Sequence, residues 1–230
     1  MSSYTYRHPR PAVRVDLVIF TVLDTDLKVL LTKRQKTPFQ GWWALPGDFL
    51  RVSDDSGAQG ESVEDAAQRQ LEKETGLPRG STFIDQVHAF GAPQRDPRGR
   101  VISVVYMALV RPDLAPLIGA KMLSTDVQWR SMTQPVALAF DHVPMIERAL
   151  SKLRDGMDRT AIAFELVPPI FTTAELRQVY EAVKGERYDA GNFRRRFRRM
   201  LTDGIIQRAP GKRQTGARPA SVYRFVGTLG

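Results

Sequence analysis

The segment Gly60–Leu77 (GESVEDAAQRQLEKETGL) constrains the fold of this chain more than any other part of its sequence. Ser62 is a residue type that caps helix N-termini, acidic side chains follow it, and Gly76 is a residue type that ends helices. The pattern therefore predicts a helix over Glu61–Thr75. Three positions spaced i, i+3 and i+4 share one face of that helix: Gln70, Lys73 and Glu74.

Segments with the pattern of strands lie on both sides of this helix. Before it, the alternating, β-branched run Val13–Leu23 is followed across an Asp-rich turn by Leu27–Thr32, which predicts a hairpin. After it, Gln86–Pro93 and Arg100–Val110 predict two further strands around the turn RDPRGR, and Leu138–Arg154 has the pattern of another helix. The mixture indicates an α/β or α+β body.

The helical segment resembles the Nudix box, whose pattern is G-x5-E-x7-R-E-U-x-E-E-x-G-U with U aliphatic. Glu61 and Arg69 stand in the positions of its first glutamate and its arginine, and its glycine, taken as Gly47, is displaced by an insertion. The other matches are Leu71, Glu74, Gly76 and Leu77. The resemblance implies a Nudix-type α/β/α sandwich within an α+β chain, and we expect Arg69 to hold the helix to the loop before it.

The departures from the box fall where the Nudix family carries metal-binding carboxylates. Gln70 is a neutral amide and Lys73 an ammonium, so only Glu74 is left of three carboxylates. Magnesium prefers anionic oxygen ligands, and the charge of Lys73 repels a cation. We therefore expect no catalytic residues, no bound metal and no required cofactor. The other carboxylates that could take over metal binding are Glu61, Asp48, Asp54 and Asp55.

Cationic and aromatic residues around the helix have the composition of a nucleotide pocket. Arginine binds pyrophosphate bidentately, and an aromatic ring stacks on a base. Each residue alone also fits a core position or a solvated turn, but the set favours a pocket. The predicted ligand-binding residues are Arg34, Phe39, Trp43, Arg95 and Arg98, with Trp42 beside them.

Positive charge is concentrated at the C-terminal end. Residues 151–230 hold 16 Lys+Arg and 8 Asp+Glu, whereas residues 1–150 hold 18 and 17. The spacing from Thr172 to Glu175 is that of a capping box and predicts a helix to about Lys184, closed by Gly185. A second helix, Asp189–Leu201, and two short β-like runs, Ile205–Arg208 and Ser221–Val226, follow it. This order predicts a winged helix-turn-helix over 155–230, after a Nudix-like domain over 1–154.

The second of these helices carries arginines around an apolar stripe of Phe193, Phe197, Met200 and Leu201. We expect the stripe to dock on the preceding helix, so that the arginines project outward and fit the major groove. The alternative is a solvated basic helix or one that faces an acidic partner, but arginines without acidic i+4 partners repel one another unless an anion is near. The predicted DNA-binding residues are Asn192, Arg194, Arg195, Arg196, Arg198 and Arg199 of the helix, and Lys212, Arg213 and Arg218 of the hairpin.

The two parts together resemble one family over nearly the whole chain, the Nudix-related transcriptional regulators (NrtR) of bacterial NAD metabolism. The likeness includes GWWALPGDFL, QRDPRGRVISVVYMALV, LAFDHVPMIERAL and FELVPPIFTTAELRQVYEAV. It implies a homodimeric repressor that binds a palindromic duplex operator of NAD-biosynthesis genes. It also implies release of the operator when the effector, ADP-ribose or a related nucleotide diphosphate, binds the Nudix-like domain.

Two other functions fit parts of the sequence. An active ADP-ribose pyrophosphatase would need another base, such as Glu61, and an RNA-binding Nudix protein would show no preference for a palindromic duplex. The absence of cysteine excludes disulfides and thiolate zinc sites. The N-terminus lacks an apolar signal-peptide core, and no apolar run reaches the ~20 residues of a membrane span. We therefore expect a soluble, cytoplasmic protein without membrane contacts.

Overall fold

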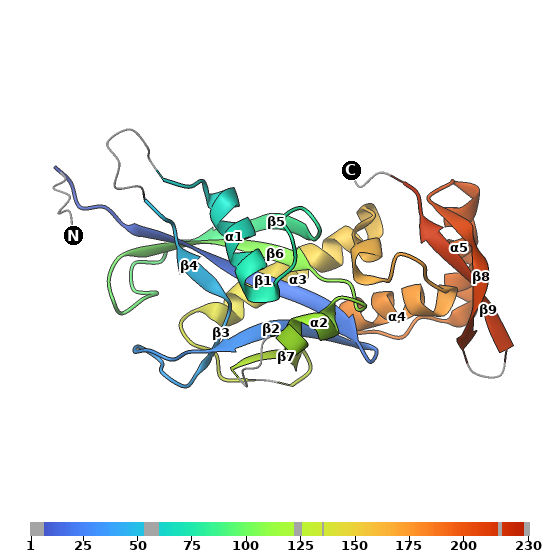
Figure 1. Cartoon of the computed structure of the whole chain (residues 1–230), viewed down its shortest axis with the longest axis horizontal. Helices are drawn as coiled ribbons and strands as arrows, with labels where there is room; N and C mark the ends of the chain where they lie inside the picture. The colour runs from blue at the N-terminus through green and yellow to red at the C-terminus, as the bar shows by residue number, and fades with distance from the viewer. Residues whose placement is uncertain (1–6, 53–59, 122–125, 135, 216–217, 228–230) are drawn as a thin grey trace.

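The computed structural model describes residues 7–52, 60–121, 126–134, 136–215 and 218–227 (Figure 1). The first elements are β1 (Ala12–Leu23), β2 (Asp26–Lys33), β3 (Trp43–Ala44), β4 (Gly47–Phe49), α1 (Val63–Thr75), β5 (Phe83–Phe90) and β6 (Val101–Leu109). They are followed by α2 (Ala115–Lys121), β7 (Val127–Ser131), α3 (His142–Arg159) and the 3-10 turn η1 (Ile162–Leu166). The chain continues with α4 (Thr173–Lys184), α5 (Ala190–Thr202), β8 (Ile206–Thr215) and β9 (Arg218–Phe225).

One mixed sheet organises the N-terminal part. In the described residues it has seven strands, with the path β3-β2-β1-β6-β5, while β4 pairs with β1 and β7 with β2. β1 and β2 form the predicted antiparallel hairpin, and β1 pairs with β6 in parallel. β1 is thus the central strand, buried on both faces, which explains its almost continuous apolar sequence.

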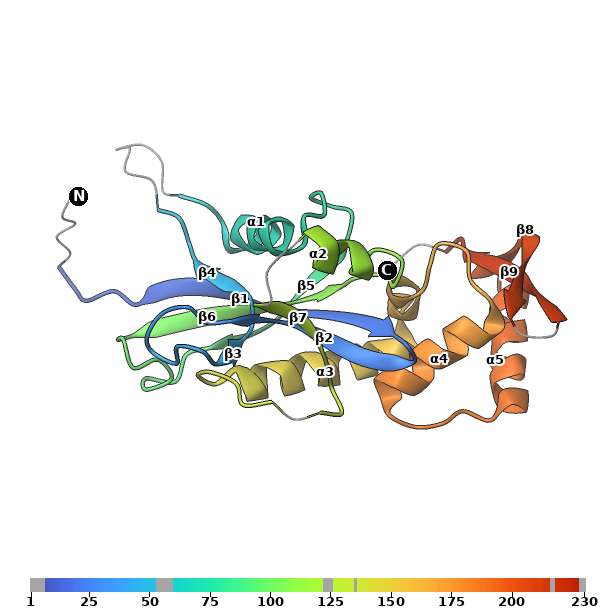
Figure 2. The ribbon, with the colours of Figure 1, turned by 60° about the horizontal axis from the view of Figure 1, so that its bottom comes forward.

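Helices cover both faces of this sheet (Figure 2). Val15, Leu17 and Ile19 of β1 share a core with α1 and α2 on one face. Val18 and Phe20, which point the other way, share a core with α3. The α/β/α sandwich predicted from the Nudix resemblance is confirmed.

The helix ends show the caps that the sequence predicts. Ser62 Oγ accepts a hydrogen bond from the Asp65 amide at 3.0 Å, and Gly76 ends α1 in the left-handed conformation with φ of 69°. Thr172 and Glu175 form the capping box of α4. These local bonds fix the start of each helix independently of the core.

The last helix of the sandwich differs from its prediction, Leu138–Arg154. Leu138 forms a β-bridge with Trp43 and Phe140 has a φ of +53°, so a helix cannot start before His142. Instead α3 runs on to Arg159, because Met157 is buried in the core and prolongs the apolar stripe. The helix crosses the expected domain boundary at 154/155 without a break, and that boundary stays a prediction.

The C-terminal part is a winged helix. Phe193 and Phe197 of α5 lie in one core with Val179 and Tyr180 of α4, so the predicted docking of the two helices is confirmed. β8 and β9 are longer than expected and pair through much of GKRQTGAR. Phe171, just before α4, forms an antiparallel bridge with Tyr223 of β9, with N–O distances of 2.9 and 2.7 Å. The sequence did not predict β3, β4, α2, β7 or η1.

Candidate functional site

Arg69 fastens α1 to the segment that precedes it. Its Nε and Nη2 atoms donate to the two carboxylate oxygens of Glu61 at 2.9 and 2.6 Å. Its Nη1 atom donates to Asp48 Oδ2 at 3.3 Å, and its Nη2 atom also donates to the Phe49 carbonyl oxygen at 3.3 Å. The structural role predicted for Arg69 is therefore confirmed.

Glu61 is occupied by these contacts. One of its oxygens also accepts the Arg51 amide at 2.8 Å, and the hydrogen bonds from Arg69 lower the pKa of this carboxyl below its ordinary value. A carboxylate stabilised in its ionised form and bound by several donors is a weak proton acceptor. Glu61 is thus poorly placed to act as a replacement base.

The face of α1 that carries metal ligands in Nudix hydrolases does not fit a divalent metal here. Gln70 is buried, and its Nε2 atom donates to Glu74 Oε1 at 2.8 Å. Lys73 Nζ lies 4.0 Å from the same oxygen, and burial raises the pKa of Glu74. Within the described ranges, no group of three His, Cys, Asp or Glu side chains could hold a metal. Asp54 and Asp55 lie outside those ranges.

A cationic cavity of about 470 Å³ opens beside this face. Its size is that of a small-molecule site. Phe49 supplies an aromatic ring that is 37% exposed. The charged residues that line the cavity are Arg14, Arg34, Lys36, Lys73 and Arg98, with Asp48 as the acidic one. This excess of positive charge suits a pyrophosphate.

Two of these arginines flank one aromatic ring. The guanidinium carbons of Arg34 and Arg98 lie 4.7 and 5.3 Å from the ring centroid of Phe140. Arg98 is balanced by Asp96, whose Oδ2 lies 2.6 Å from its Nη2 atom. Burial, together with the charges of Arg98 and Arg14, lowers the pKa of Arg34. The cavity thus holds cations that repel one another, and an anionic ligand would relieve this repulsion.

Arg14 is held in the cavity wall by a buried carboxylate. Its Nη2 atom lies 2.6 Å from Asp16 Oδ1, and Asp16 also accepts a hydrogen bond from the Ser103 hydroxyl. Burial acts to raise the pKa of Asp16, but Arg14, His142 and the Ser103 hydrogen bond outweigh it, so the pKa is lowered. Gly47 of β4 is needed beside this pair, because a methyl group there would collide with both side chains.

His142 closes this cluster from α3. Its Nδ1 atom accepts a hydrogen bond from the Leu45 amide at 2.9 Å. Burial lowers its pKa to about 4, so the imidazole is neutral at physiological pH. The ring therefore holds the β3–β4 connection as an acceptor rather than as a cation.

The structure brings Arg34 and Arg98 into the cavity but does not place the other predicted ligand residues in its wall. Arg95 is buried and donates to both carboxylate oxygens of Asp141 at 2.9 and 2.7 Å, so its charge is already paired inside the fold. Phe39 contacts Trp42 and Phe140, with ring centroids 5.5 and 4.8 Å away. Trp43 packs under Arg130, at 4.6 Å.

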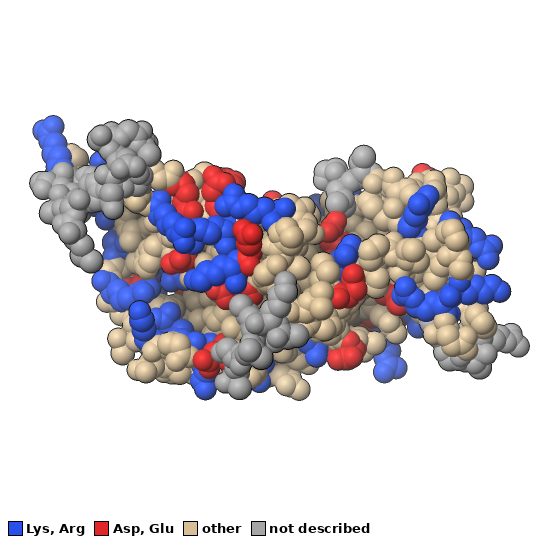
Figure 3. Space-filling view, viewed as in Figure 1, with Lys and Arg blue, Asp and Glu red and all other residues tan. Residues whose placement is uncertain are grey.

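The outer end of the winged helix carries a dense group of cations. Figure 3 shows lysine and arginine side chains gathered around α5, β8 and β9. Arg195 hydrogen-bonds to Asn192 Oδ1 on the same helix. The predicted DNA-binding residues without any ion-pair partner among the described residues include four exposed cations, Arg194, Arg198, Arg199 and Lys212.

Two predicted DNA-binding arginines face the protein instead. Arg196 forms an ion pair with Asp158 of α3 at 3.0 Å and donates to the Tyr180 hydroxyl at 2.9 Å. Arg213 pairs with Glu175 of α4 and donates to the Ile170 carbonyl oxygen at 2.9 Å. Both satisfy carboxylates from other elements, and their contact with a duplex stays a prediction. The side chain of Arg218 lies outside the part that the structure describes.

Residues 12–149 match the model of the NUDIX domain, and residues 163–225 match that of the NrtR DNA-binding winged helix domain. The chain is also 33% identical to the ADPR responsive transcriptional repressor NtrR of Acinetobacter baylyi, over 95% of this chain and 83% of that protein. This chain belongs to the NrtR family of Nudix-related transcriptional regulators. The resemblance inferred from the sequence motifs is thereby confirmed.

Other relatives of this NrtR-family chain cover one or both parts. A structure of Shewanella oneidensis NrtR complexed with a 27mer DNA matches 93% of each chain, with a TM-score of 0.80 and 31% identity. The NUDIX domain of the same protein complexed with ADP ribose matches 64% of this chain and 90% of that one, with a TM-score of 0.50 and 32% identity. An ADP-ribose pyrophosphatase of Methanocaldococcus jannaschii is 35% identical over 62% of this chain and 73% of that protein.

Sequence reasoning missed several residues of the cavity in this NrtR-family chain. Arg14 and Phe49 line it, and Asp16 positions Arg14. A signal was present, because Arg14 and Asp16 interrupt an apolar strand at positions i and i+2 and therefore share one face of the sheet. Among the described residues, no helix is long and apolar enough to cross a membrane.

Proposed function

We propose that this chain is an ADP-ribose-responsive repressor of NAD-metabolism genes. The observation that carries the proposal is the presence of two sites in one chain. One is a cation-lined cavity beside a Nudix helix that does not fit a metal, and the other is a winged helix with a group of exposed arginines and lysines. Shewanella oneidensis NrtR is known in complex with a 27mer DNA, and its NUDIX domain in complex with ADP ribose.

The chemistry of the cavity supports a nucleotide diphosphate as effector. Arg34, Arg98 and Arg14 can donate to a pyrophosphate, and Phe49 offers a ring on which adenine can stack. Lys73 adds a fixed positive charge on the face where Nudix hydrolases carry metal ligands. Binding without turnover is the expected result.

α3 supports a physical connection between the two sites. At its start, His142 accepts the Leu45 amide beside the cavity wall, and the preceding Asp141 binds Arg95. At its end, the Met157 carbonyl oxygen accepts the Tyr180 hydroxyl at 2.8 Å, and Asp158 pairs with α5. A straight helix of 18 residues spans about 27 Å, so a shift at one end is carried to the other.

The proposed mechanism uses two chains that pair and place two α5 helices about one DNA turn apart on a palindrome. Nucleotide binding would favour a dimer in which these helices are wrongly spaced. By linkage, bound DNA must then weaken nucleotide binding by the same factor. The cytoplasm is the compartment in which such a regulator would act.

The test is a gel shift on duplexes taken upstream of NAD-synthesis genes, titrated with ADP-ribose. We expect a retarded band with the wild-type chain and loss of this band when ADP-ribose is added. When Arg34 and Arg98 are both changed to Gln, the band should persist in the presence of ADP-ribose. Structured RNA of equal length serves as the competitor. Equal binding of RNA and duplex, or indifference to ADP-ribose, would count against the proposal.

A second candidate is an active ADP-ribose pyrophosphatase, which the Methanocaldococcus relative and the retained box carboxylate Glu74 favour. It requires that ADP-ribose be cleaved to AMP and ribose 5-phosphate in the presence of magnesium. Chromatography of such an incubation decides between the two. Turnover comparable with that of a Nudix hydrolase would replace the sensor proposal.

A further inference from the structure

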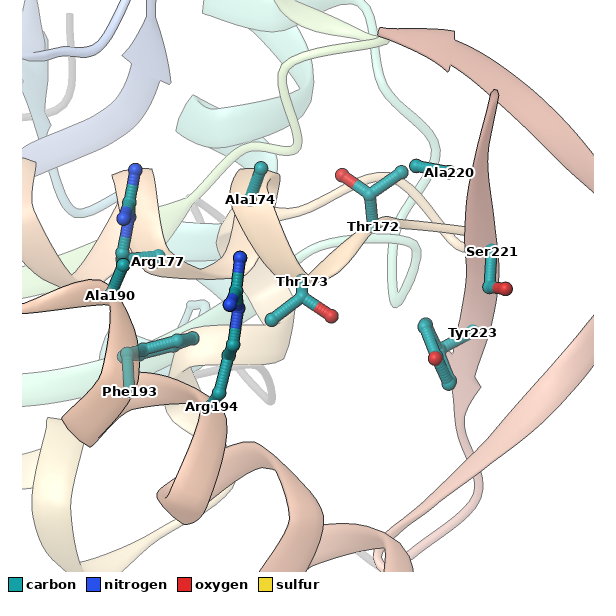
Figure 4. Close-up of a pocket in the computed structure, with 10 residues that line it drawn as sticks. All are labelled: Thr172, Thr173, Ala174, Arg177, Ala190, Phe193, Arg194, Ala220, Ser221 and Tyr223. Atoms are coloured by element: carbon teal, nitrogen blue, oxygen red, sulfur yellow. The ribbon is translucent and has the colours of Figure 1, made fainter. Parts of the chain in front are cut away.

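A second cavity, of about 390 Å³, lies on the winged helix between the beginnings of α4 and α5 and strand β9. Figure 4 shows the residues that line it, with Arg177 of α4 and Arg194 of α5 extending in the same direction. Thr173 and Ser221 add hydroxyl groups from α4 and β9. No acidic residue is among those that line the cavity.

Both arginines have unused hydrogen-bonding capacity. Arg177 has one ion pair, in which its buried Nε atom lies 3.6 Å from Glu181 Oε1 on its own helix, and this contact is not a hydrogen bond. Arg194 is exposed and has no ion pair in the same part of the chain. Two guanidinium groups in one cavity repel each other unless an anion lies between them.

The cavity also lies at a helix N-terminus. Thr172 Oγ1 accepts only the Glu175 amide, at 3.2 Å, and the earlier amides of a helix have no intrahelical acceptor. The positive end of the helix dipole therefore adds to the charge of the arginines. A compact anion with several oxygens suits this combination better than a base edge, which presents donors as well as acceptors.

We propose that this cavity holds one phosphodiester group of the bound duplex, gripped by Arg177 and Arg194. The inference rests on the proposed DNA-binding function. It adds α4 to the DNA interface, for which the sequence predicted residues of α5 and the β8–β9 hairpin only. Because a phosphate is the same at every base pair, this contact sets the position of α5 on the duplex and does not read its sequence.

The experiment compares Arg177→Gln and Arg194→Gln with the wild-type chain and with Arg148→Gln, which removes one exposed arginine from α3. Fluorescence anisotropy with a labelled random-sequence duplex gives the affinity at several salt concentrations. A lost phosphate contact reduces the slope of log K against log salt by about 0.9. We expect this reduction and a several-fold loss of affinity in both cavity variants, and neither in Arg148→Gln.

A second arm locates the phosphate. The wild-type chain first selects a binding sequence from a random pool of duplexes. A series of duplexes of this sequence is then made, each with one neutral methylphosphonate at a different position of the backbone. We expect one position in each half-site at which the substitution weakens the wild-type chain but has no further effect on either cavity variant. This non-additivity separates a shared phosphate from a general loss of charge.

The outcomes are distinguishable. Cavity variants that bind like Arg148→Gln, or weakened variants that keep the wild-type methylphosphonate pattern, overturn the inference and leave the DNA-binding function standing. A wild-type chain that binds no duplex at low salt overturns the DNA-binding function and, with it, the inference.

Discussion

Asp158, near the end of α3, binds both α4 and α5: its carboxylate is 3.0 Å from Arg196 Nη1 of α5 and 2.6 Å from Lys184 Nζ of α4. The hydrogen bond from Lys184 lowers the pKa of Asp158, and Arg196 adds to that effect. One carboxylate from the sandwich thus fixes both helices of the helix-turn-helix. The position of α5 therefore depends on α3.

Replacing Asp158 should weaken the communication between the two sites. We expect Asp158→Ala to reduce the factor by which ADP-ribose weakens duplex binding by about 2- to 30-fold, with little change in ADP-ribose affinity. The stability loss should be about 1 kcal/mol or less, since the pair is half-exposed. Duplex affinities measured with and without saturating ADP-ribose give the factor. Asp155→Ala, exposed on the same helix, is the control, and an equal effect in both variants would contradict the role of Asp158.

The position of Lys73 leads to a second prediction, that ADP-ribose binding does not depend on magnesium. Because its ammonium lines the cavity and no metal cluster is found among the described residues, ADP-ribose should bind equally well in EDTA and in magnesium. Lys73→Glu should weaken binding in EDTA by about tenfold or more, the effect of losing one charged contact. Isothermal titration calorimetry measures both affinities.

The matched control for Lys73 is Lys212→Glu, which makes the same charge change on the wing, away from the cavity. Wild-type binding that requires magnesium would show that a metal site exists after all. Adding Gln70→Glu to Lys73→Glu restores the box carboxylates, and this double variant tests for a gain of magnesium-dependent hydrolysis.

The local features of the chain could be predicted from its sequence. Ser62 and Gly76 bound α1, Thr172 caps α4, and Arg69 binds the loop before its helix, because each of these contacts joins residues close in sequence or fixed by a motif. The apolar stripe of α5 likewise specified which face packs on α4. Capping residues, one motif and the periodicity of α5 were sufficient for these features.

Long-range pairing could not be predicted in the same way. The anion that neutralises Arg196 is Asp158, 38 residues away and on the other side of the expected domain boundary. Arg95 is paired with Asp141 over 46 residues. The sequence places Arg196 in a run of arginines and Arg95 in an arginine-rich turn. Only the fold shows that each charge is paired with a carboxylate far away along the chain.

This difference between neighbouring arginines leads to a third prediction. Arg198→Ala and Arg199→Ala should weaken duplex binding and each reduce the salt slope by about 0.9 if they contact phosphates, without lowering the melting temperature. Arg196→Ala should lower the melting temperature, because Asp158 and Tyr180 lose their partner. Anisotropy and differential scanning fluorimetry on the three variants separate the two roles. A stable Arg196→Ala protein with a reduced salt slope would contradict the assignment.

His142 gives the last prediction, a dependence of stability on pH. Its pKa is lowered from an ordinary 6.5 to about 4, so the unfolded chain binds a proton more readily than the folded one between these values. Its contribution to stability is therefore complete above pH 6.5 and is lost as the pH falls toward 4. At pH 5 the loss should reach about 2 kcal/mol.

His142→Asn keeps an acceptor for the Leu45 amide but cannot be protonated, so its unfolding free energy should fall less between pH 7 and pH 5. Urea denaturation at the two pH values gives the fall in unfolding free energy for each protein. Comparing the two falls removes the contribution of the carboxylates, because both proteins contain them. Equal losses in the two proteins would show that His142 is not the group that responds to pH.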